Sequence, residues 1–425
     1  MKLLVVGGGG REHALCWSLA REASVFCAPG NPGTATVATN LDLSPDQPDA
    51  LLRGVREHRI DLVVIGPEGP LAAGLADRLR AAGVPVFGPS ARAARIEASK
   101  AYAKALMASA GVPTAEAATF TRRAPALDYI DAHPEPLVVK ASGLAAGKGA
   151  VVCATRADAR AAAEAMFGGR FGAAGDEVIV EEFLDGEELS VFALTDGERV
   201  LLLPASQDHK RLGEGDTGPN TGGMGAYTPV SIATDTLFDR VEREILLPTL
   251  RSLDADGSRY AGVLYAGLMI RPDGAPAVIE FNCRFGDPEA QVVLPALDRG
   301  LVDDFGRIAR GEEWTPRPPR LHAARAAVTT ILAASGYPEA PRKGAPITLP
   351  DTLPDDTVLF HAGTRRDPDG TLRVAGGRVL CATGFGPDVP TAAARSRVLA
   401  EAIRFEGRQL RLDIAWREVA RSGVA

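Results

Sequence analysis

The sequence predicts an α/β protein built from several domains, and three observations support this fold class. The chain has 425 residues, and at about 100–200 residues per domain this length corresponds to two to four domains. The N-terminal part alternates between short apolar runs and helical patterns, which is typical of βαβ units and a parallel sheet. Short strand patterns dominate the C-terminal part, so we expect a β-rich domain there.

Short apolar runs in the N-terminal part are the candidate strands of the parallel sheet. The runs cover residues 2–6, 25–28, 61–65 and 84–87, and each ends at a loop rich in glycine or proline. A helical pattern follows the first run, over residues 12–21. Because ligands bind outside the carboxyl ends of parallel strands, these loops are expected to form one wall of a binding site.

The rest of the chain divides into a long middle part and a shorter end. Residues 91–110 have one continuous helical pattern that ends at Gly111-Val112-Pro113, a stop signal. Strands are expected at 137–140, 150–153, 178–184, 189–194, 200–204, 262–270 and 277–282. Beyond a linker at 314–320, strands are expected at 326–333, 345–349, 357–361, 372–374 and 378–383, with a closing helix at about 391–405.

Composition and charge exclude several classes of protein. Hydrophobic residues make up 46% and charged residues 24% of the chain, which is ordinary for a globular protein. The net charge of −7 argues against nucleic acid as a partner. No uncharged apolar run reaches about 18 residues, and the run before Gly7 is too short for a signal peptide, so no membrane partner is expected. The five scattered cysteines favour a reducing, cytoplasmic location.

A run of glycines, Gly7 to Gly10, joins the first strand to the first helix. Free N–H groups and the helix dipole at such a position favour a phosphate. The dinucleotide fingerprint fits poorly, because Glu12 occupies its third glycine position. A phosphate-bearing substrate is therefore favoured over NAD, and the alternative is a tight turn without a ligand.

A second glycine-rich loop, Gly143-Leu144-Ala145-Ala146-Gly147-Lys148-Gly149, lies between two expected strands. It is one residue shorter than a P-loop and lacks the Ser or Thr that would hold magnesium. Its N–H groups and Lys148 can still cover nucleotide phosphates, and Lys140 can reach the same groups. Lysine is scarce, yet five of the seven lysines fall in segments with candidate functional residues: Lys100, Lys104, Lys140, Lys148 and Lys210. The alternative is a hairpin loop with solvated lysines.

A long stretch from Gly213 to Gly225 contains six glycines and follows the charged sequence Asp208-His209-Lys210-Arg211. Loops of this length inside compact domains are usually functional or disordered. Its last part, Asn220-Thr221-Gly222-Gly223, offers bare backbone amides beside the charge cluster. These features favour a binding loop over a flexible linker.

The strand expected at 277–282 carries polar residues at alternate positions. Side chains repeat every two residues along a strand, so Glu280, Asn282 and Arg284 fall on one face. A carboxylate and an amide oxygen are hard ligands of the kind that Mg²⁺ takes beside substrate phosphates. Arg284 can hold a carboxylate or a phosphoryl group through two hydrogen bonds. The alternative is a half-exposed strand whose polar residues face water.

Taken in order, these segments resemble the ATP-grasp superfamily and, within it, the phosphoribosylamine–glycine ligase family, over nearly the whole chain. The segments that carry the resemblance are residues 7–13, 140–149, 208–211, 219–226 and 280–289. The resemblance implies an N-terminal parallel-sheet domain of the Rossmann-like pre-ATP-grasp type, an ATP-grasp α+β core with a mobile lid, and a small C-terminal β-rich domain. The implied boundaries are 1–103, 104–322 (lid about 115–188, central part about 189–322) and 323–425.

By this resemblance the chain uses ATP, with Mg²⁺ or Mn²⁺, to join glycine to 5-phosphoribosylamine in purine biosynthesis, giving glycinamide ribonucleotide, ADP and phosphate. The implied path runs through glycyl phosphate: the glycine carboxylate attacks the γ-phosphate, and the sugar amine then attacks the acyl group. Such chemistry needs positioning and cancellation of charge rather than an activated Ser, Cys or His. The implied partners are these small substrates, and a monomer is compatible with the resemblance.

The resemblance also implies roles for individual residues. Nucleotide contacts are implied for Lys100, Lys140, Gly143, Gly147, Lys148, Gly149, Glu181, Phe183, Leu184 and Glu188. Glu181 is expected to accept from the adenine amino group and Glu188 to hold the ribose. Metal ligation is implied for Glu280 and Asn282. Substrate contacts are implied for Gly9, Asn31, Glu68, Asp208, Lys210, Asn220, Gly223 and Arg284; Arg284, Asp208 and Lys148 are the expected catalytic residues.

Other functions stay open at this point. Another ATP-grasp ligase, such as a carboxylase or a different purine enzyme, would share the nucleotide site. An NAD-dependent oxidoreductase would use the N-terminal sheet, although Glu12 argues against it. A nucleotide sensor without catalysis would not need Lys140, Lys148, Glu280 and Asn282 together. Residues 263–269 lack the acid that many ATP-grasp enzymes carry there, so the ligands of a second metal are open, as are the oligomeric state and the choice of Mg²⁺ or Mn²⁺.

Overall fold

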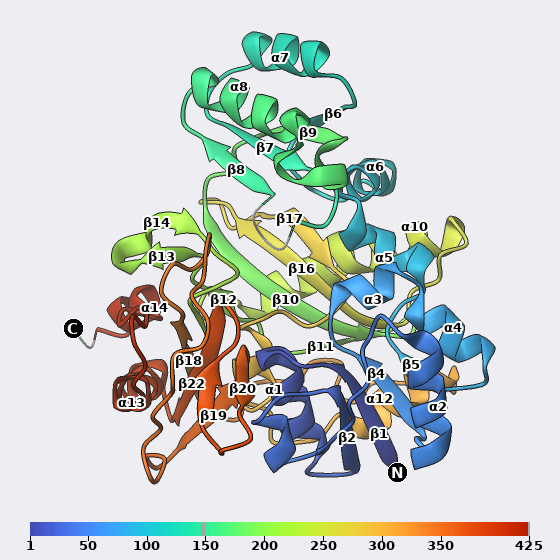
Figure 1. Ribbon diagram of the computed structural model, residues 1–425. Helices are drawn as coiled ribbons and strands as arrows, with labels where there is room; N and C mark the ends of the chain where they lie inside the picture. Colours follow the sequence, from blue (N-terminus) through green and yellow to red (C-terminus); the bar gives the residue numbers. More distant parts are fainter. Residues whose placement is uncertain (146–148, 424–425) are drawn as a thin grey trace.

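The chain forms a broad body with a smaller lobe above it (Figure 1). This computed structural model describes residues 1–145 and 149–423. Within these ranges the strands form four sheets of four or five strands and two separate hairpins. None of the helices in the described ranges is long and apolar enough to span a membrane.

The N-terminal part forms a five-stranded parallel sheet in the order β3-β2-β1-β4-β5, which confirms the predicted parallel sheet. Its strands are β1 (Lys2–Gly7), β2 (Ser24–Pro29), β3 (Thr39–Asn40), β4 (Leu62–Ile65) and β5 (Val86–Phe87). The helices beside it are α1 (Gly10–Leu19), α2 (Pro48–His58), α3 (Glu68–Ala72), α4 (Leu75–Ala81) and α5 (Ala91–Ala98). The apolar residues of β1 and β4 are buried, as expected for central strands covered on both faces.

The upper lobe in Figure 1 is a four-stranded antiparallel sheet in the order β6-β9-β7-β8. Its strands are β6 (Ala117–Phe120), β7 (Leu137–Ala141), β8 (Ala150–Cys153) and β9 (Val178–Glu182). The helices α7 (Arg123–Ala132) and α8 (Arg156–Ala165) lie over its outer side. The lobe has a hydrophobic core of its own, which includes Ile130, Val139 and Val180.

Residues 91–110 form two helices, where the sequence pattern predicts one. The helix α5 ends at Ala98 and α6 (Lys100–Ala110) begins at Lys100. Ser99 between them has an extended backbone, and its hydroxyl accepts a hydrogen bond from the N–H of Tyr102, which caps α6. The break is stabilised from the lobe, because the N–H of Lys100 donates to Ser142 O at 2.9 Å.

A four-stranded antiparallel sheet in the order β11-β10-β16-β17 lies beneath the lobe. Its strands are β10 (Glu187–Thr195), β11 (Val200–Leu202), β16 (Gly262–Ile270) and β17 (Pro276–Asn282). The next helices along the chain are α9 (Asp235–Val241), α10 (Leu247–Ala255), α11 (Ala290–Val293) and α12 (Val302–Arg310); α9 contacts β17 and α12 contacts β16, whereas α11 contacts β15 and β18. In the register of this sheet Glu280 stands opposite Gly267 and Asn282 opposite Tyr265, so both polar residues lie at the end of β17.

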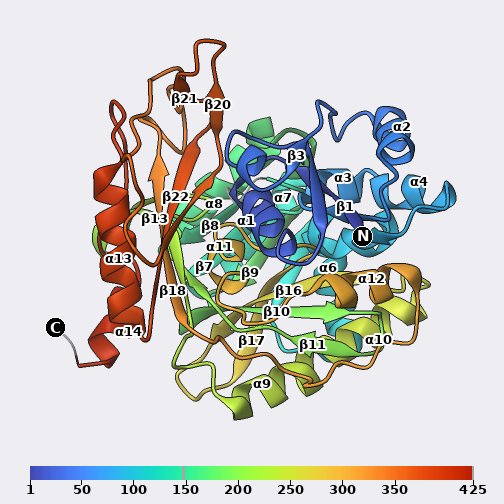
Figure 2. The ribbon, with the colours of Figure 1, turned by 90° about the horizontal axis from the view of Figure 1, so that it is seen from below.

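The remaining large sheet joins the middle of the chain to its end, in the order β12-β15-β18-β22-β19. Its strands are β12 (Gln207–Asp208), β15 (Gly225–Thr228), β18 (Ala326–Ala333), β19 (Thr357–His361) and β22 (Arg378–Gly386). Two hairpins flank it, β13 (Arg211–Gly213) with β14 (Thr217–Asn220), and β20 (Thr364–Arg366) with β21 (Leu372–Val374). Figure 2 shows α13 (Val389–Ala402) along this sheet, followed by α14 (Trp416–Arg421).

The predicted strand at 345–349 is wrong. Pro346 and Thr348 form only isolated bridges, to Arg373 and Arg404. Proline has no backbone N–H to donate to a ladder, so the pairing stops there. The expectation of a β-rich C-terminal part is confirmed by β18, β19 and β22.

Candidate active site

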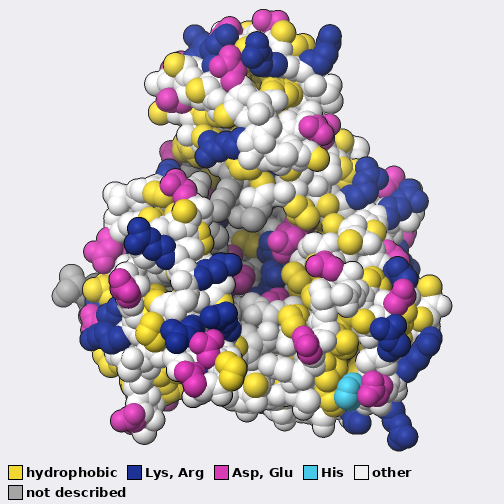
Figure 3. Space-filling view, viewed as in Figure 1, with side chains coloured by type: hydrophobic (Ala, Val, Ile, Leu, Met, Phe, Trp, Pro, Cys, Tyr) yellow, Lys and Arg dark blue, Asp and Glu magenta, His cyan; other side chains and the backbone are white. Residues whose placement is uncertain are grey.

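A cavity of about 410 Å³, lined by charged and apolar side chains, lies between the lobe and the body. Figure 3 shows a hollow beneath the lobe, with Lys or Arg and Asp or Glu side chains inside it. The predicted site residues that line the cavity are Glu68, Lys100, Lys140, Gly149, Glu181, Phe183, Leu184, Glu188, Asp208, Lys210, Asn220, Glu280, Asn282 and Arg284. The cavity therefore brings together residues that lie more than two hundred positions apart.

Two lysines of the cavity share one buried carboxylate. Glu181 on β9 forms an ion pair with Lys140 on the neighbouring β7, and its Oε2 lies 2.7 Å from Nζ of Lys104 on α6. Lys104 also donates to Thr114 Oγ1 and to Ala115 O, each at 2.9 Å. Burial lowers the pKa of Lys104, and the charge of Glu181 opposes that effect. Two cations with one anion leave a net positive charge away from water, which favours an anionic ligand.

Lys100 adds a further cation from the first turn of α6. Its Nζ donates to Gly143 O at 3.2 Å, so Lys100 contacts the start of the glycine-rich loop. Burial lowers the pKa of Lys100, while Glu280 raises it. Gly149 and the loop residues Leu144 and Ala145 line the cavity. The predicted phosphate contacts at Gly147 and Lys148 lie outside the described residues.

An apolar strip follows β9. Phe183 is 39% exposed and Leu184 is 9% exposed, and both line the cavity. Val138, Ile179 and Met269 also belong to the apolar part of the lining. A narrow apolar surface next to a cationic one suits an aromatic base attached to phosphates.

Two side chains on β17 fit a divalent cation. The amide Nδ2 of Asn282 is buried without a hydrogen-bond partner, and among the described residues the carboxylate of Glu280 forms no hydrogen bond or ion pair. Burial raises the pKa of Glu280, but Lys210, Lys100 and Lys140 outweigh it and lower the pKa below its ordinary value. An ionised carboxylate and an amide that can turn its oxygen to the cavity match the oxygen ligands of Mg²⁺.

The strand β17 offers two candidate metal ligands, Glu280 and Asn282. In the ranges that the structure describes there is no group of three or more His, Cys, Asp or Glu that could hold a metal ion. A cation at Glu280 and Asn282 would therefore need water or phosphate oxygens as further ligands. Such a ligand set is typical of Mg²⁺ at phosphate sites.

Arg284 is held between two carboxylates of the N-terminal part. Its Nη2 lies 2.7 Å from Glu97 Oε1 and its Nε lies 3.2 Å from Glu68 Oε2. Arg11 approaches the same Glu68 oxygen at 3.7 Å. Burial raises the pKa of Glu68, but Arg284 and Arg11 bring it down to about 2. These pairs fix the guanidinium of Arg284 in the cavity and join the segment after β17 to α3 and α5 of the N-terminal part.

Asp208 and Lys210 stand on another wall of the cavity. Lys210 forms an ion pair with Glu188, whereas the carboxylate of Asp208 has no hydrogen bond or ion pair within the described ranges. Burial raises the pKa of Asp208 to about 7; Lys210 opposes this effect, and Glu289 and Glu188 add to it. Asp208 is thus a carboxyl group that changes its charge near neutral pH.

Asn31 does not line the cavity, although it was predicted to contact substrate. Its Nδ2 donates to Gly8 O at 2.9 Å and to His361 O at 2.8 Å. Its Oδ1 accepts from the N–H groups of Gly33 and Thr34. The amide therefore fastens the loop after β2 to the loop after β1 and to β19.

Gly9 and Gly223 also lie outside the lining. The N–H of Gly9 donates to Glu12 Oε2 at 2.7 Å. Gly223 has a φ of +106°, which disfavours any other residue, and a Cβ there would lie 2.5 Å from Pro288 Cδ. Its neighbour Gly222 does line the cavity. The substrate roles of Gly9, Asn31 and Gly223 stay predictions.

Several lining residues have no predicted role, namely Arg11, Glu97, Lys104, Tyr265, Asp287, Glu289 and Arg378. Arg11, Asp287 and Glu289 lie within the motifs of the resemblance, and the scarcity of lysine already singled out Lys104. Glu97, Tyr265 and Arg378 carry no such signal. Arg378 reaches the cavity only because β22 pairs with β18, and its Nη2 lies 3.1 Å from Asp287 Oδ2.

A second hollow, of about 650 Å³, lies elsewhere on the surface beside Trp17, Arg21 and Arg325. It is wide and shallow. None of the predicted site residues lines it, and its lining offers one carboxylate, Asp298, and no lysine. We therefore place the candidate active site in the cavity beneath the lobe.

Three family models match consecutive parts of the chain. They are described as the phosphoribosylglycinamide synthetase N domain, ATP-grasp (A) domain and C domain, and they match residues 1–97, 98–290 and 327–417. Together they cover most of the chain, in the order N domain, ATP-grasp domain and C domain.

Individual relatives agree with these matches. A phosphoribosylamine–glycine ligase of Nostoc sp. is 48% identical over 423 residues, covering 98% of this chain and 99% of its own. One of Agrobacterium fabrum is 46% identical over 430 residues, with 99% of each chain covered. The crystal structure of phosphoribosylamine–glycine ligase from Thermotoga maritima superposes with a TM-score of 0.86 at 34% identity, over 97% of this chain and 100% of that one.

A more distantly related protein shares the fold. The biotin carboxylase domain of a Hydrogenobacter thermophilus 2-oxoglutarate carboxylase superposes with a TM-score of 0.72 at 17% identity, covering 96% of this chain and 91% of that one. The three matched domains and the relatives at nearly half identity show that the chain belongs to the phosphoribosylglycinamide synthetase family of ATP-grasp ligases.

Proposed function

We propose that the cavity beneath the lobe joins glycine to 5-phosphoribosylamine with the use of ATP, giving glycinamide ribonucleotide, ADP and phosphate. One observation carries this proposal: a cationic wall faces an ionised Glu280 and a fixed Arg284 across one cavity, in a chain of the phosphoribosylglycinamide synthetase family. Phosphoryl transfer needs this combination of positioning and charge cancellation.

The nucleotide fits the side of the cavity next to the lobe. Phe183 and Leu184 would contact the adenine, and Lys100 and Lys140 would contact the phosphates. Glu181 sets the position of Lys140 through their ion pair, in addition to the adenine contact that the resemblance implies. Glu188, at the mouth of the cavity, would hold the ribose. The glycine-rich loop from Gly143 to Gly149 would cover the phosphates, with Lys148 as its cation.

Glu280 and Asn282 would hold a divalent cation, which we propose to be Mg²⁺, with Mn²⁺ as a substitute. A divalent cation bound there supplies positive charge to the phosphate oxygens. The lysines around Glu280 keep the carboxylate ionised and ready to ligate.

Arg284 is suited to hold the glycine carboxylate. A guanidinium has five N–H donors, and three of its nitrogen atoms are engaged with Glu68, Glu97 and Phe285 O. One N–H on each Nη remains, and the two can point to one carboxylate. Asp208 in its ionised form would attract the glycine ammonium group. Lys210 and the backbone amides near Asn220 would contact the acyl phosphate.

The reaction then takes two displacements. A carboxylate oxygen of glycine attacks the γ-phosphorus and ADP leaves, which forms glycyl phosphate. The amine of phosphoribosylamine attacks the acyl carbon, the phosphate leaves, and the amine gives up a proton. Arg284 and the lysines hold these anionic groups close together, which converts each encounter into a step within one complex.

We assign phosphoribosylamine to the N-terminal domain, residues 1–103, beside the ATP-grasp domain at 104–322 and the C-terminal domain at 323–425. Glu68 lines the cavity from this domain, and the loops at Gly9 and Asn31 lie next to it. All five cysteines are buried and unpaired, which supports a cytoplasmic location. We propose that the enzyme acts as a monomer.

An assay of ADP release tests the proposed function. The protein is incubated with ATP, Mg²⁺, glycine and freshly prepared phosphoribosylamine, and other small carboxylic acids replace glycine in parallel reactions. We expect ADP and glycinamide ribonucleotide in equal amounts with glycine. Release of ADP with another acid and none with glycine would contradict the proposal and favour a different ATP-grasp ligase.

A further inference from the structure

The hairpin of β13 and β14, residues 211–220, has both of its ends in the active-site cavity. Lys210 precedes it and Asn220 ends it, and both line the cavity. The N–H of Thr221 donates to Lys210 O at 2.7 Å, which closes the base of the hairpin. Its own ladder is short and its register shifts between Arg211 and Gly213. The position of the hairpin must therefore be set by something other than its own hydrogen bonds.

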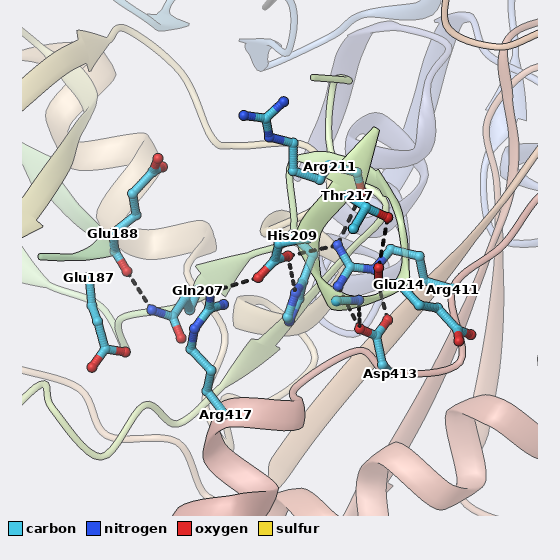
Figure 4. A network of polar contacts seen from close by, with 12 residues as sticks. Glu187, Glu188, Gln207, His209, Arg211, Glu214, Thr217, Arg411, Asp413 and Arg417 are labelled. Atoms are coloured by element: carbon cyan, nitrogen blue, oxygen red, sulfur yellow. Dashed lines mark hydrogen bonds and ion pairs between the residues drawn. The ribbon is translucent and has the colours of Figure 1, made fainter. Parts of the chain in front are cut away.

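Arg411, from the segment 411–417 after α13, is inserted against this hairpin (Figure 4). Its side chain is 0% exposed. Its Nη1 donates to Arg211 O at 3.1 Å and to Asp216 Oδ1 at 2.8 Å. Its Nε and Nη2 donate to the two oxygens of Asp413 at 2.8 and 2.7 Å. One guanidinium thus joins the first strand and the turn of the hairpin to the C-terminal segment.

The same segment holds the turn of the hairpin in other ways. Asp413 Oδ2 accepts from the N–H of Gly215 at 2.9 Å, and Glu214 Oε1 accepts from the N–H of Leu412 at 3.0 Å. Arg417 Nη2 donates to Asp216 Oδ2 at 2.6 Å. Asp216 has a φ of +57°, which is unusual for a residue other than glycine. The contacts from 411–417 account for its persistence in this conformation.

His209 connects the segment 411–417 directly to Asp208 and Lys210, which line the cavity. It lies between Asp208 and Lys210 in the chain, and its side chain is 1% exposed. Its Nε2 accepts from the N–H of Ala415 at 2.9 Å, and its Nδ1 lies 3.7 Å from Asp216 Oδ1. Because Nε2 accepts, the ring carries its proton on Nδ1, toward Asp216. Burial lowers the pKa of His209, so the ring stays neutral.

We propose that Arg411 is a positioning residue for the ligase reaction: through the hairpin and His209, the segment 411–417 sets where Asp208 and Lys210 stand in the cavity. This inference rests on the proposed function, in which Asp208 and Lys210 serve the glycine side. It assigns to the C-terminal domain a role in the geometry of the active site.

The substitution Arg411→Lys tests this role. Lysine keeps the charge but cannot reproduce the fork that reaches a carbonyl and two carboxylates at once. We expect kcat/KM for glycine to fall between about 10- and 100-fold, because a shift of about 1 Å at a reacting group has effects of this size. The KM for ATP should change less than this, because no ion pair joins the described hairpin residues to Lys140 or Glu181. Any effect on ATP would pass through the ion pair of Lys210 with Glu188.

Arg373→Lys is a matched control in the same domain. Arg373 forms an ion pair with Asp367 and donates from Nη1 to Gly344 O at 3.0 Å, at the other hairpin, β20 with β21. No described residue of that hairpin lines the cavity. We expect this variant to lower the melting temperature without changing the kinetic constants for glycine. Equal kinetic effects of the two substitutions, or none for a folded Arg411→Lys, would overturn the proposal.

Hydrogen exchange gives a readout that does not depend on the reaction. The N–H groups of Thr221 and Met224 donate to Lys210 O and His209 O, and their exchange should become at least about tenfold faster in Arg411→Lys but not in Arg373→Lys. Unchanged exchange would overturn the proposal. Faster exchange in Arg411→Lys, together with a wild-type protein that does not ligate glycine, would contradict the proposed function but not the positioning role of Arg411.

A milder variant covers the case in which Arg411→Lys does not fold. Arg417 is 34% exposed at its side chain, and in the part of the chain that the structure describes its ion pair with the hairpin is the one with Asp216. Arg417→Gln should leave the protein folded and raise the KM for glycine about two- to fivefold, with faster exchange at Thr221. A folded Arg417→Gln with wild-type exchange and wild-type kinetics for glycine would contradict the proposal.

Discussion

Nζ of Lys104 lies 2.7 Å from Oε2 of Glu181, and Lys140 forms an ion pair with the other carboxylate oxygen. Glu181 is therefore the anion that holds two cations side by side at the edge of the cavity. Without it, burial and mutual repulsion would favour loss of a proton from one of them. In the free protein the carboxylate of Glu181 therefore holds Lys104 and Lys140 in place for phosphate binding. This role is separate from any contact of Glu181 with the adenine.

Lys104→Met should weaken ATP binding. The substitution removes one cation of the wall and leaves Glu181 with Lys140 alone, so we expect about tenfold weaker binding of ATP and a loss of about 1–3 kcal/mol of stability. Lys343→Met, at an exposed lysine outside the cavity, is the control. Titration calorimetry with a non-hydrolysable ATP analogue and thermal unfolding measure the two effects. Unchanged affinity in Lys104→Met would remove this residue from the nucleotide site.

Glu280→Gln should abolish most of the activity without unfolding the protein. The carboxylate is the anion among Lys100, Lys140 and Lys210, and its loss removes the charged ligand of the proposed cation. We expect kcat to fall at least about 100-fold, as for other single electrostatic contacts in active sites. Initial rates over a range of Mg²⁺ concentrations check the prediction, and near-normal turnover at saturating Mg²⁺ would count against a metal role.

Asp208 should give the reaction a pH dependence near neutrality. Because burial raises its pKa to about 7, Asp208 is mostly neutral below pH 7 and no longer attracts the glycine ammonium group. We expect the KM for glycine to rise about tenfold per pH unit below pH 7 and to level off above it. Asp208→Asn should remove this dependence. A KM for glycine that stays constant between pH 6 and 8 in the wild type would contradict the role of Asp208.

The same group should affect stability with a defined sign. The pKa of Asp208 in the folded protein is raised from its ordinary value of 3.8, so its contribution to stability is full below about pH 3.8 and is lost as the pH rises through 7. Asp208→Asn removes the buried negative charge. We therefore expect a higher melting temperature than wild type at pH 8 and a smaller difference at pH 5, by differential scanning calorimetry. A lower melting temperature at pH 8 would show that Asp208 is stabilised as an anion.

Arg284→Lys should separate charge from geometry at the glycine site. A lysine keeps the positive charge but cannot bridge Glu68 and Glu97 and still offer two parallel N–H groups to a carboxylate. We expect kcat/KM for glycine to fall about 100-fold, with KM for ATP nearly unchanged. Steady-state kinetics with each substrate varied in turn measures the split. Wild-type constants for glycine would place the carboxylate elsewhere.

The sequence predicted the features that depend on local periodicity. The alternation along β17 placed Glu280 and Asn282 on one face, and the structure has both at the same cavity. The parallel N-terminal sheet followed from apolar runs that end in glycine and proline. These patterns are set by residues close together in the sequence, so they can be recognised without knowledge of contacts between distant segments.

Features that depend on distant contacts could not be predicted in this way. The break at Ser99 is stabilised by Ser142 in the lobe. Arg378 reaches the cavity through sheet pairing, and Arg411 reaches the hairpin beside it through packing of the C-terminal part. Asn31 has the sequence context of a ligand-binding loop, yet its amide is used to join loops. A turn that binds and a turn that only packs have the same local sequence signals.

Transfer of oxygen from glycine to phosphate tests the central claim most directly. Glycine labelled with ¹⁸O in its carboxyl group is supplied with ATP and phosphoribosylamine, and the phosphate released is analysed by mass spectrometry. Attack of the carboxylate on the γ-phosphorus predicts one ¹⁸O atom in each phosphate formed. Phosphate without the label, formed together with glycinamide ribonucleotide, would contradict a glycyl phosphate intermediate in this cavity.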